Sequence, residues 1–379
     1  MKPKLIRAST VPGSLATFCK GFLKELSDEY EVIALSSPGE DLKLIAECEN
    51  VRTIAVDMER HISLKKDIVS LYNLIRVFCK EKPIIVHSIT PKAGLLCMVA
   101  AWLMRVPLRV HTFTGLVFPT SYGLKRRILM LTDWITCICA THIIPEGEGV
   151  KKDLLTNSIT KKELKVLGYG NVRGVDMEHY ARTKAVLDEA MKVRTPGIFT
   201  FIFIGRLVRD KGINELVAVA RCLYEEGFKF RVLLLGTFEE KLDPLQAETR
   251  KILFNAEYID FVGRKKDVRP WLVASDVLVF PSYREGFPNV VLEAGAMGLP
   301  SIVTDINGSR EIIQQDFNGV IIPPHNIDAL YRAMKDFLEN PQKVNKMASV
   351  ARKIIGERYE QSFVRQCQKN FYKKILEAV

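Results

Sequence analysis

Short apolar runs rich in β-branched and aromatic residues recur along this chain, and a helical pattern follows nearly every one. Three such runs are Phe199–Ile204, Phe230–Leu235 and Val277–Phe280. Strands that are apolar on both faces are typical of parallel sheets covered by helices, and the alternation supplies the crossovers that parallel pairing needs. The pattern predicts an α/β protein with parallel sheets, whose ligands bind at the carboxyl ends of the strands.

The chain has 379 residues, which suits two domains of ordinary size. The polar stretch Ala181–Gly197 ends in a Pro-Gly pair and is the expected boundary. We assign residues 1–185 to a first domain and residues 198–357 to a second. In the first domain, one helix is predicted over Ser14–Leu26 and a last strand over Leu164–Leu167.

No stretch of the sequence has the character of a membrane span or a secretory signal. The longest apolar runs, Leu95–Met104 and Ile128–Ala140, are shorter than the ~20 residues that a spanning helix needs. The eight cysteines form no Cys-x-x-Cys pair: Cys19, Cys48, Cys79, Cys97, Cys137, Cys139, Cys222 and Cys367. We therefore expect reduced thiols and a cytoplasmic location, with peripheral attachment to the inner face of the cytoplasmic membrane left open.

The net charge of +11 calls for an anionic partner. Nucleic acid is not expected, because the chain has no zinc-finger spacing, RNP-like aromatic motif or basic repeat. An anionic membrane surface and a diphosphate-bearing substrate both account for the charge. The segment Tyr122–Met130, which contains Arg126, combines basic and apolar residues as membrane-surface helices do. A buried helix with a solvated basic end is the alternative.

A strand, a tight loop and a helix follow one another around two glutamates. The run Val277–Phe280 is the strand and Asn289–Met297 is the expected helix, with Pro288 suited to its first turn. The free N–H groups at the start of such a helix can bind an anion. A carboxylate accepts two hydrogen bonds side by side, so Glu285 and Glu293 suit the paired hydroxyls of a hexose or a ribose. The alternative is that both glutamates are solvated or cap the helix.

This stretch resembles the donor-site motif of the retaining, nucleotide-sugar-dependent glycosyltransferases of family four. It reads Glu285-Gly286-Phe287-Pro288-Asn289-Val290-Val291-Leu292-Glu293. The resemblance implies the GT-B fold, which has two facing Rossmann-like domains and a last helix, here within 360–379, that returns to the first domain. It also implies that Glu285 contacts the donor sugar, that the loop amides contact the diphosphate and that Glu293 holds the ribose.

Other strand exits of the second half fit the same resemblance. Gly205-Arg206 and the later Lys211-Gly212 resemble the family's Gly-Arg and Lys-Gly elements. This implies that Arg206 and Lys211 stabilise the leaving diphosphate without a metal, although a solvated basic turn is the alternative. Gly236 and Gly263 follow the next two strands and are expected near the donor nucleotide.

The acceptor side is expected at the strand exits of the first half. The first strand exit differs, because Gly13 is the one residue there that matches a two-glycine loop which approaches donor phosphate or acceptor in many relatives. We count Gly13 among the donor-binding candidates, and a turn with Ser14 as the helix N-cap is the alternative. His87 and Lys92 flank a Thr-Pro helix start that resembles a family pattern. For His87, a satisfied core histidine is the alternative to an acceptor contact.

Thr114 stands where many relatives carry a histidine directly before a glycine, here Gly115. This departure removes one usual catalytic candidate, and His111 lies three residues earlier, inside the predicted strand. The local pattern looks like the branch that builds bacterial capsular polysaccharides and exopolysaccharides on lipid carriers. We take Thr114, Gly115 and Arg126 as further acceptor-side candidates.

These observations together predict a GT-B glycosyltransferase. It is expected to move a hexose or N-acetylhexosamine from a UDP-linked donor to a glycan acceptor carried on polyprenyl diphosphate, with retention at the anomeric carbon. Neither a metal nor another cofactor is expected. Two alternatives stay open: an epimerase or hydrolase of the same fold that acts on a sugar nucleotide, and an inactive partner that binds a nucleotide sugar for another transferase.

Overall fold

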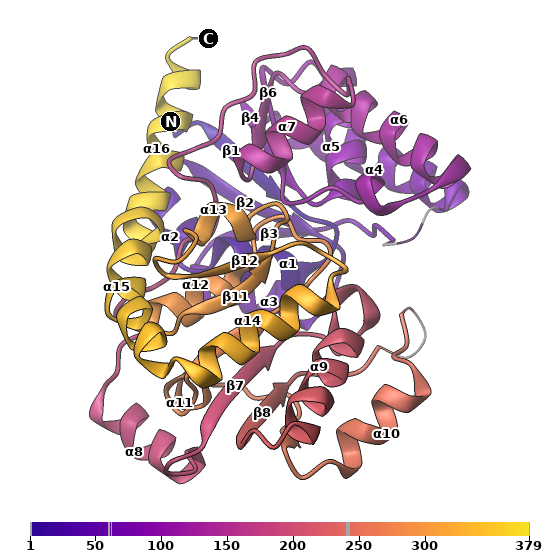
Figure 1. The fold of residues 1–379 in the computed structure, drawn as a ribbon. Helices are drawn as coiled ribbons and strands as arrows, with labels where there is room; N and C mark the ends of the chain where they lie inside the picture. The colour runs from indigo at the N-terminus through magenta and orange to yellow at the C-terminus, as the bar shows by residue number, and fades with distance from the viewer. Residues whose placement is uncertain (1, 60, 62, 240–242, 379) are drawn as a thin grey trace. The chain divides into compact units, whose positions relative to one another are not determined.

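The computed structural model describes residues 2–59, 61, 63–239 and 243–378. Within them the chain forms two compact units: the first runs to Gly174 and resumes at Ser362, and the second is Val175–Gln361. In the described residues each unit contains one parallel sheet of six strands with helices packed against it (Figure 1). The α/β class with two Rossmann-like units is therefore confirmed.

The boundary lies earlier than the sequence indicated. Residues 175–185, predicted to end the first domain, belong to the second unit. The backbone N–H of Val175 donates to the carbonyl of Tyr359 at 2.8 Å, and Arg182 Nε donates to the carbonyl of Met297 at 2.8 Å. These two bonds hold the segment around residues 175–185 to the second unit.

In the first unit the strands lie in the order β3-β2-β1-β4-β5-β6. Their bounds are β1 (Lys4–Ala8), β2 (Glu31–Ser36), β3 (Arg52–Ala55), β4 (Ile85–Ile89), β5 (Leu108–Phe113) and β6 (His142–Pro145). The helices are α1 (Pro12–Cys19), α2 (Phe22–Leu26), α3 (Glu40–Glu49), α4 (Leu64–Glu81), α5 (Pro91–Leu103), α6 (Gly123–Cys139), α7 (Glu148–Thr156) and α16 (Gln361–Leu376), with a 3-10 turn η1 (Phe118–Thr120).

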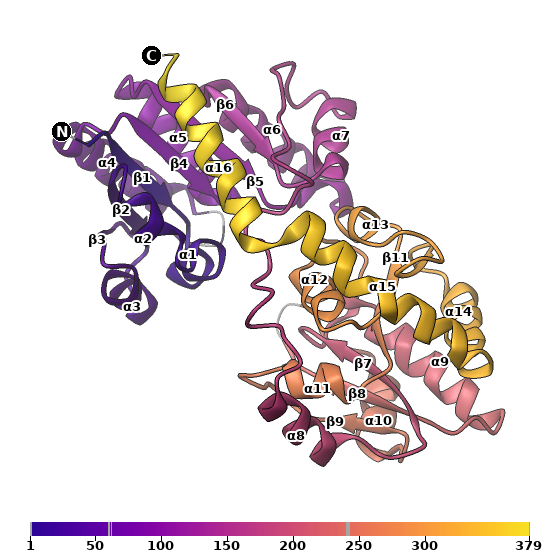
Figure 2. The same ribbon diagram turned by 90° about the vertical axis from the view of Figure 1, so that its left-hand side faces the viewer.

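Two cores lie on opposite faces of this sheet because successive residues of a strand point to opposite sides. Ile6 of β1 packs into the core that includes Leu74 of α4 and Cys97 of α5. Its neighbour Leu5 packs into the core that includes Leu15 of α1 and Phe371 of α16. Helix α16 therefore completes the first unit, which confirms the predicted return of the last helix (Figure 2).

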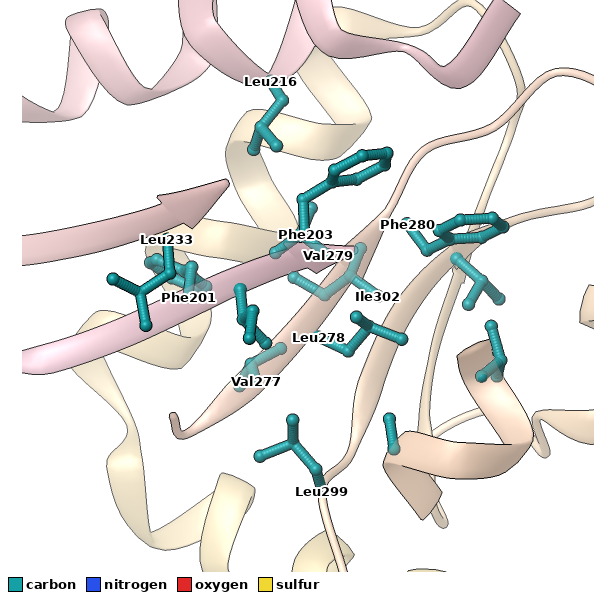
Figure 3. Packing of buried hydrophobic residues seen from close by; sticks show 14 of the residues in the cluster. Phe201, Phe203, Leu216, Leu233, Val277, Leu278, Val279, Phe280, Leu299 and Ile302 are labelled. Carbon is teal, nitrogen blue, oxygen red and sulfur yellow. The ribbon is translucent and has the colours of Figure 1, made fainter. Parts of the chain in front are cut away.

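In the second unit the order is β12-β11-β10-β7-β8-β9. The strands are β7 (Phe199–Ile204), β8 (Phe230–Leu235), β9 (Ile259–Phe261), β10 (Val277–Phe280), β11 (Ser301–Thr304) and β12 (Gly319–Ile322). The helices are α8 (Lys184–Val193), α9 (Ile213–Glu225), α10 (Ala247–Asn255), α11 (Arg269–Val273), α12 (Asn289–Ala296), α13 (Ser309–Ile312), α14 (Ile327–Glu339) and α15 (Pro341–Tyr359), with a 3-10 turn η2 (Arg209–Lys211). Figure 3 shows the central strands packing through Phe201, Val279 and Ile302, all fully buried.

Three local predictions were wrong. The helix expected over Ser14–Leu26 is two helices, because Gly21 adopts φ 73° between α1 and α2. The strand expected over Leu164–Leu167 is reduced to one isolated bridge between Leu164 and Ile143. No helix was expected in the polar boundary stretch 181–197, but it contains α8, whose N-cap Thr183 accepts a hydrogen bond from the N–H of Val186.

Candidate active site

The carboxyl ends of β7 and β10 lie side by side at the centre of the second sheet. From this pair the strand order continues in opposite directions, through β8 and β9 on one side and through β11 and β12 on the other. Open parallel sheets bind ligands at such a switch point. The loop after β7 carries Arg206 and Lys211, and the loop after β10 carries Glu285. The three predicted catalytic residues therefore come from the two loops that flank the switch point.

Lys211 and Glu285 form an ion pair through Nζ and Oε1. Their side chains are only 13% and 16% exposed, so water screens this pair less than a surface pair. The ammonium group also lies 5.4 Å from the ring centroid of Phe280, within range of a cation–π contact. The structure thus brings these two predicted residues together in a sheltered place at the strand exits.

Two further residues position Glu285. The hydroxyl of Ser282 donates a hydrogen bond of 2.8 Å to Glu285 Oε1, the same oxygen that contacts Lys211. The hydroxyl of Thr304, at the end of β11, donates in turn to the carbonyl oxygen of Ser282. Both residues are buried, which leaves the carboxylate little freedom to turn.

Glycine at position 308 lets a neighbouring loop approach the Glu285 loop closely. Gly308 has φ 73°, in the left-handed region that favours glycine. A Cβ atom there would lie 2.5 Å from the carbonyl oxygen of Gly286 and 2.6 Å from Cα of Phe287. The backbone that presents Glu285 is therefore packed against Gly308, and any other residue at this position would force one of the two loops to move.

A cavity of about 360 Å³ opens at the carboxyl ends of β7, β8 and β9, beside the switch point. Its lining combines apolar strand ends with three cations: Ile204, Gly205, Arg206, Leu235, Gly236, Thr237, Arg264, Lys265 and Val268. Gly236 has φ 154°, and a Cβ there would lie 1.7 Å from the carbonyl oxygen of Gly205. Its N–H donates to the carbonyl of Gly263 at 3.1 Å, so the predicted glycines Gly205, Gly236 and Gly263 join neighbouring strand exits.

Arg206 lies at the edge of this cavity and is half exposed. Its guanidinium donates to Glu239 Oε2 at 2.6 Å. An anion entering the cavity therefore meets a guanidinium that is held by one carboxylate and still open to solvent. The cavity and the Lys211–Glu285 pair both belong to the second unit.

The side chains of the predicted donor motif are of two kinds, one buried in the core and the others half-buried. Phe287 is buried and its ring lies 5.5 Å from that of Tyr359, so its side chain supports the loop. Asn289, Val290 and Glu293 are half-buried on the first two turns of α12. Pro288 is the N-cap of α12, one residue before the first-turn position that the sequence suggested.

In the first unit His87 belongs to a buried hydrogen-bond network. Its Nδ1 lies 2.7 Å from Arg7 Nη1 and 2.5 Å from the hydroxyl of Tyr372, and its Nε2 lies 2.7 Å from Thr112 Oγ1. Burial, reinforced by the charge of Arg7, lowers the pKa of His87 well below its usual range. His87 is therefore a satisfied core histidine, and its prediction as an acceptor contact is wrong because the ring is buried with partners at both nitrogens.

His111 is likewise structural. Its Nδ1 lies 2.8 Å from the hydroxyl of Ser88, and burial lowers its pKa to about 3. The ring fills the space beside Gly94, where an added Cβ would lie 2.4 Å from Cε1. At the exit of the same strand, β5, the candidate Thr114 is half-buried and Gly115 adopts φ 125°.

The other acceptor-side candidates lie on two helices of the first unit, and the donor-side candidate Gly13 lies on a third. Lys92, in the first turn of α5, donates to Asp67 Oδ1 at 2.6 Å and so links α5 to α4. Arg126 on α6 donates to Asn157 Oδ1 at 2.8 Å. Gly13 lies inside α1, whose N-cap is Val11, so the alternative with Ser14 as N-cap was wrong.

Sequence reasoning missed Ser282, Thr304 and Lys265. Ser282 follows directly on the strand and Pro281, and read as a turn residue. The only available signal was its position three residues before Glu285, on the same loop. Lys265 lines the cavity one residue after Arg264 and lies 5.2 Å from the ring centroid of Trp271.

The fold and this basic, carboxylate-bearing switch point define a class, the enzymes with two Rossmann-like units of the GT-B type. Two family models match the chain: Glycosyl transferase 4-like over residues 11–137 and Glycosyl transferases group 1 over residues 188–354. The chain belongs to this glycosyltransferase family.

Two curated relatives cover most of the chain. It is 28% identical over 356 residues to the capsular polysaccharide biosynthesis glycosyltransferase CapM of Staphylococcus aureus, which covers 94% of this chain and 92% of CapM. It is 30% identical over 281 residues to the UDP-Gal:alpha-D-GlcNAc-diphosphoundecaprenol alpha-1,3-galactosyltransferase of Escherichia coli, covering 73% of this chain and 71% of that enzyme. The similarity to these two relatives identifies the protein as a glycosyltransferase of surface polysaccharide biosynthesis.

Solved structures share the fold at low identity. Anabaena HepE in complex with UDP superposes with a TM-score of 0.80 and 16% identity over 99% of this chain and 100% of that one. The lipopolysaccharide outer core galactosyltransferase WaaB gives a TM-score of 0.71 and 18% identity over 99% and 100%. Among the described residues, no helix has the length and apolar character that crossing a membrane requires.

Proposed function

We propose that this enzyme transfers a hexose or N-acetylhexosamine from a UDP-linked donor to a glycan carried on polyprenyl diphosphate, with retention at the anomeric carbon. The observation that carries the proposal is the sheltered Lys211–Glu285 pair beside the basic cavity at the switch point. The name of the Escherichia coli relative, which gives a UDP-Gal donor and a diphosphoundecaprenol-linked acceptor, supports both substrate classes.

The second unit binds the donor in this proposal. The nucleotide enters the cavity at the ends of β7, β8 and β9, and its diphosphate lies near Arg206 and the first N–H groups of α12. Glu285 accepts hydrogen bonds from the donor sugar, and Glu293 accepts them from the ribose. Arg206 exchanges Glu239 for phosphate oxygens as the donor binds.

Arg206 and Lys211 stabilise the charge that develops on the departing diphosphate. The bond between the anomeric carbon and the phosphate oxygen breaks while the acceptor oxygen bonds to the same carbon. The departing phosphate takes the proton of the acceptor hydroxyl. Attack and departure use one face of the sugar, so the configuration is retained, and no metal or other cofactor has a role in this scheme.

The first unit binds the acceptor in this proposal, through the strand exit that carries Thr114 and Gly115. An acceptor on polyprenyl diphosphate is held in a bilayer, so the enzyme works as a peripheral protein on the inner face of the cytoplasmic membrane. Nucleic acid has no part in this function.

The test is release of UDP by the full chain from a panel of UDP-sugars, with and without polyprenyl-diphosphate-linked acceptors and with and without a chelator. We expect one donor to give UDP release that requires the acceptor and does not change with chelator. UDP release without an acceptor would instead favour a hydrolase, and conversion of the sugar without UDP release would favour an epimerase. UDP binding without turnover across the panel would favour an inactive partner of another transferase.

A further inference from the structure

The outer surface of α6 carries a stripe of exposed apolar side chains. Leu124, Leu131, Trp134 and Ile138 lie three to seven residues apart on this helix, and their exposed fractions run from 45% to 73%. The inner surface of α6 packs against α5 through Cys137 and the first core of the unit. Helix α6 is therefore apolar on both sides, although only one side has a partner among the described residues.

A second stripe lies at the start of α4, on the same side of the sheet. Leu64, Ile68 and Tyr72 are spaced by four residues and are 77%, 68% and 59% exposed. Helix α5 lies between α4 and α6 and packs against both, and Figure 1 shows the three helices together. The apolar stripes therefore belong to one helical layer, on the opposite face of the sheet from α16.

The part of this layer that contains α5 and α6 is almost without acidic residues, and the two acids of α4 are paired, Asp67 with Lys92 and Glu81 with Lys4. From residue 91 to residue 140 the sequence contains six Lys and Arg and one acid, Asp133, which is buried. Lys125 and Arg127 are exposed in the first turns of α6, between Leu124 and the rest of the stripe. The exposed surface that these residues form is apolar and positively charged, which complements an anionic surface.

The N-terminus of α6 lacks the features that stabilise a solvent-exposed helix end. Its N-cap is Tyr122, without a side-chain hydrogen bond, and its first turn contains no acidic residue. Lys125 and Arg127 lie near the positive end of the helix dipole, where cations are unfavourable. Anionic groups outside the protein would offset both the cations and the open N–H groups.

We propose that the outer face of α6, together with the exposed stripe of α4, docks on a bilayer that carries anionic lipid headgroups. Helices with this pattern lie in the interface with the apolar side inserted and the cations at the headgroups. A second copy of the chain is disfavoured as the occupant because both copies would present cations. The candidates Thr114 and Gly115 begin the loop that leads from β5 to α6. Docking therefore brings a lipid-linked acceptor to that strand exit, an inference that rests on the proposed function.

Co-sedimentation of the full chain with vesicles tests the docking. The vesicles are phosphatidylcholine alone or phosphatidylcholine with phosphatidylglycerol at a ratio of about seven to three. We expect binding at least ~10-fold tighter to the anionic vesicles, and weaker binding as salt rises. Leu131→Asp/Trp134→Asp and Lys125→Glu/Arg127→Glu should each lower this binding by ~10-fold or more.

The matched control is Leu44→Asp on α3, a residue of similar exposure on the other face of the same sheet. It should bind vesicles like the wild type, and circular dichroism should show all variants folded. Equal binding to both vesicle types, or unchanged binding by both double variants, would overturn the proposal, as would a dimer in sedimentation that the α6 variants dissociate. Lys211→Ala should still bind vesicles, so loss of transfer and loss of docking are separate results.

Discussion

Lys211 and Glu285 form an ion pair across the switch point of the second sheet, although 74 positions separate them in the chain. Each comes from the loop that leaves one of the two central strands, β7 and β10. The pair satisfies both charges before any ligand arrives. A donor diphosphate and a donor sugar would then compete for groups that are already held in place.

Replacing Lys211 by alanine should lower kcat by roughly 10²-fold or more, since removing one preorganised group at a developing charge typically has that effect. The measurement is UDP release at saturating donor and acceptor. Arg209→Ala is the matched control, because Arg209 is a cation of the same 3-10 turn and pairs with Asp243 in an exposed position. Full activity of Lys211→Ala would refute the assigned role, as would an equal loss in the control.

Ser282→Ala should lower kcat by about 5- to 20-fold, because Glu285 loses the hydroxyl that fixes its carboxylate. The KM for the donor should change less, since the carboxylate itself remains. Steady-state kinetics with both substrates varied separate the two effects. Ser275→Ala removes an equally buried hydroxyl that donates to the carbonyl of Trp271, and it should leave kcat near the wild-type value. Equal kcat values for the two variants would contradict the proposal that the Ser282 hydroxyl positions Glu285.

Gly308→Ala should raise the KM for the donor by about 10-fold, because the new Cβ displaces the backbone around Gly286. Gly227→Ala provides the control: Gly227 has φ 88°, and a Cβ there meets nothing within 4 Å. Both variants carry the left-handed backbone strain, roughly 1–2 kcal/mol. Only Gly308→Ala should alter donor binding, and similar donor affinity in the two variants would contradict the role of the close approach.

Acid should destabilise the first unit through His111. Burial lowers its pKa from 6.5 to about 3, so between these values the unfolded chain binds a proton that the folded unit does not. The free energy of unfolding keeps its full His111 contribution above pH 6.5. It falls by about 1.4 kcal/mol per pH unit as the pH drops from 6.5 toward 3. Hydrogen exchange of the β5 amides should report this, and His111→Asn should make the profile less steep, while His87, whose pKa is also lowered by burial, keeps the rest of the acid dependence. Parallel profiles for wild type and variant would contradict the assignment.

The sequence predicted the central strands of the second unit well because runs buried on both faces are continuous. Phe199–Ile204 and Val277–Phe280 were predicted with the bounds that β7 and β10 have. Helices α3 and α10 were missed, since about half of the residues in Glu40–Glu49 and Ala247–Asn255 are polar and each helix buries few residues. The apolar segment at Leu164 read as a strand because local pattern cannot show whether a sheet offers it a partner.

The candidate site was predictable where one loop carries its own signal. Glu285 and Lys211 could be placed near each other because both follow parallel strands, whose carboxyl ends share an edge. The role of His87 could not be decided, since its partner Tyr372 lies 285 residues away on the last helix. The sequence showed that Tyr122–Met130 combines basic and apolar residues, but only burial distinguishes the outward face of α6 from its core face.

The packing of α16 in the first unit reverses the order in which the two units can mature during synthesis. The second unit is one continuous segment, Val175–Gln361, and has all of its residues before α16 is made. The first unit begins earlier but lacks Phe371, Tyr372 and Ile375 of its second core until translation reaches them. A ribosome-bound chain can therefore complete the second unit first, and the first unit, although its synthesis starts earlier, completes its core last.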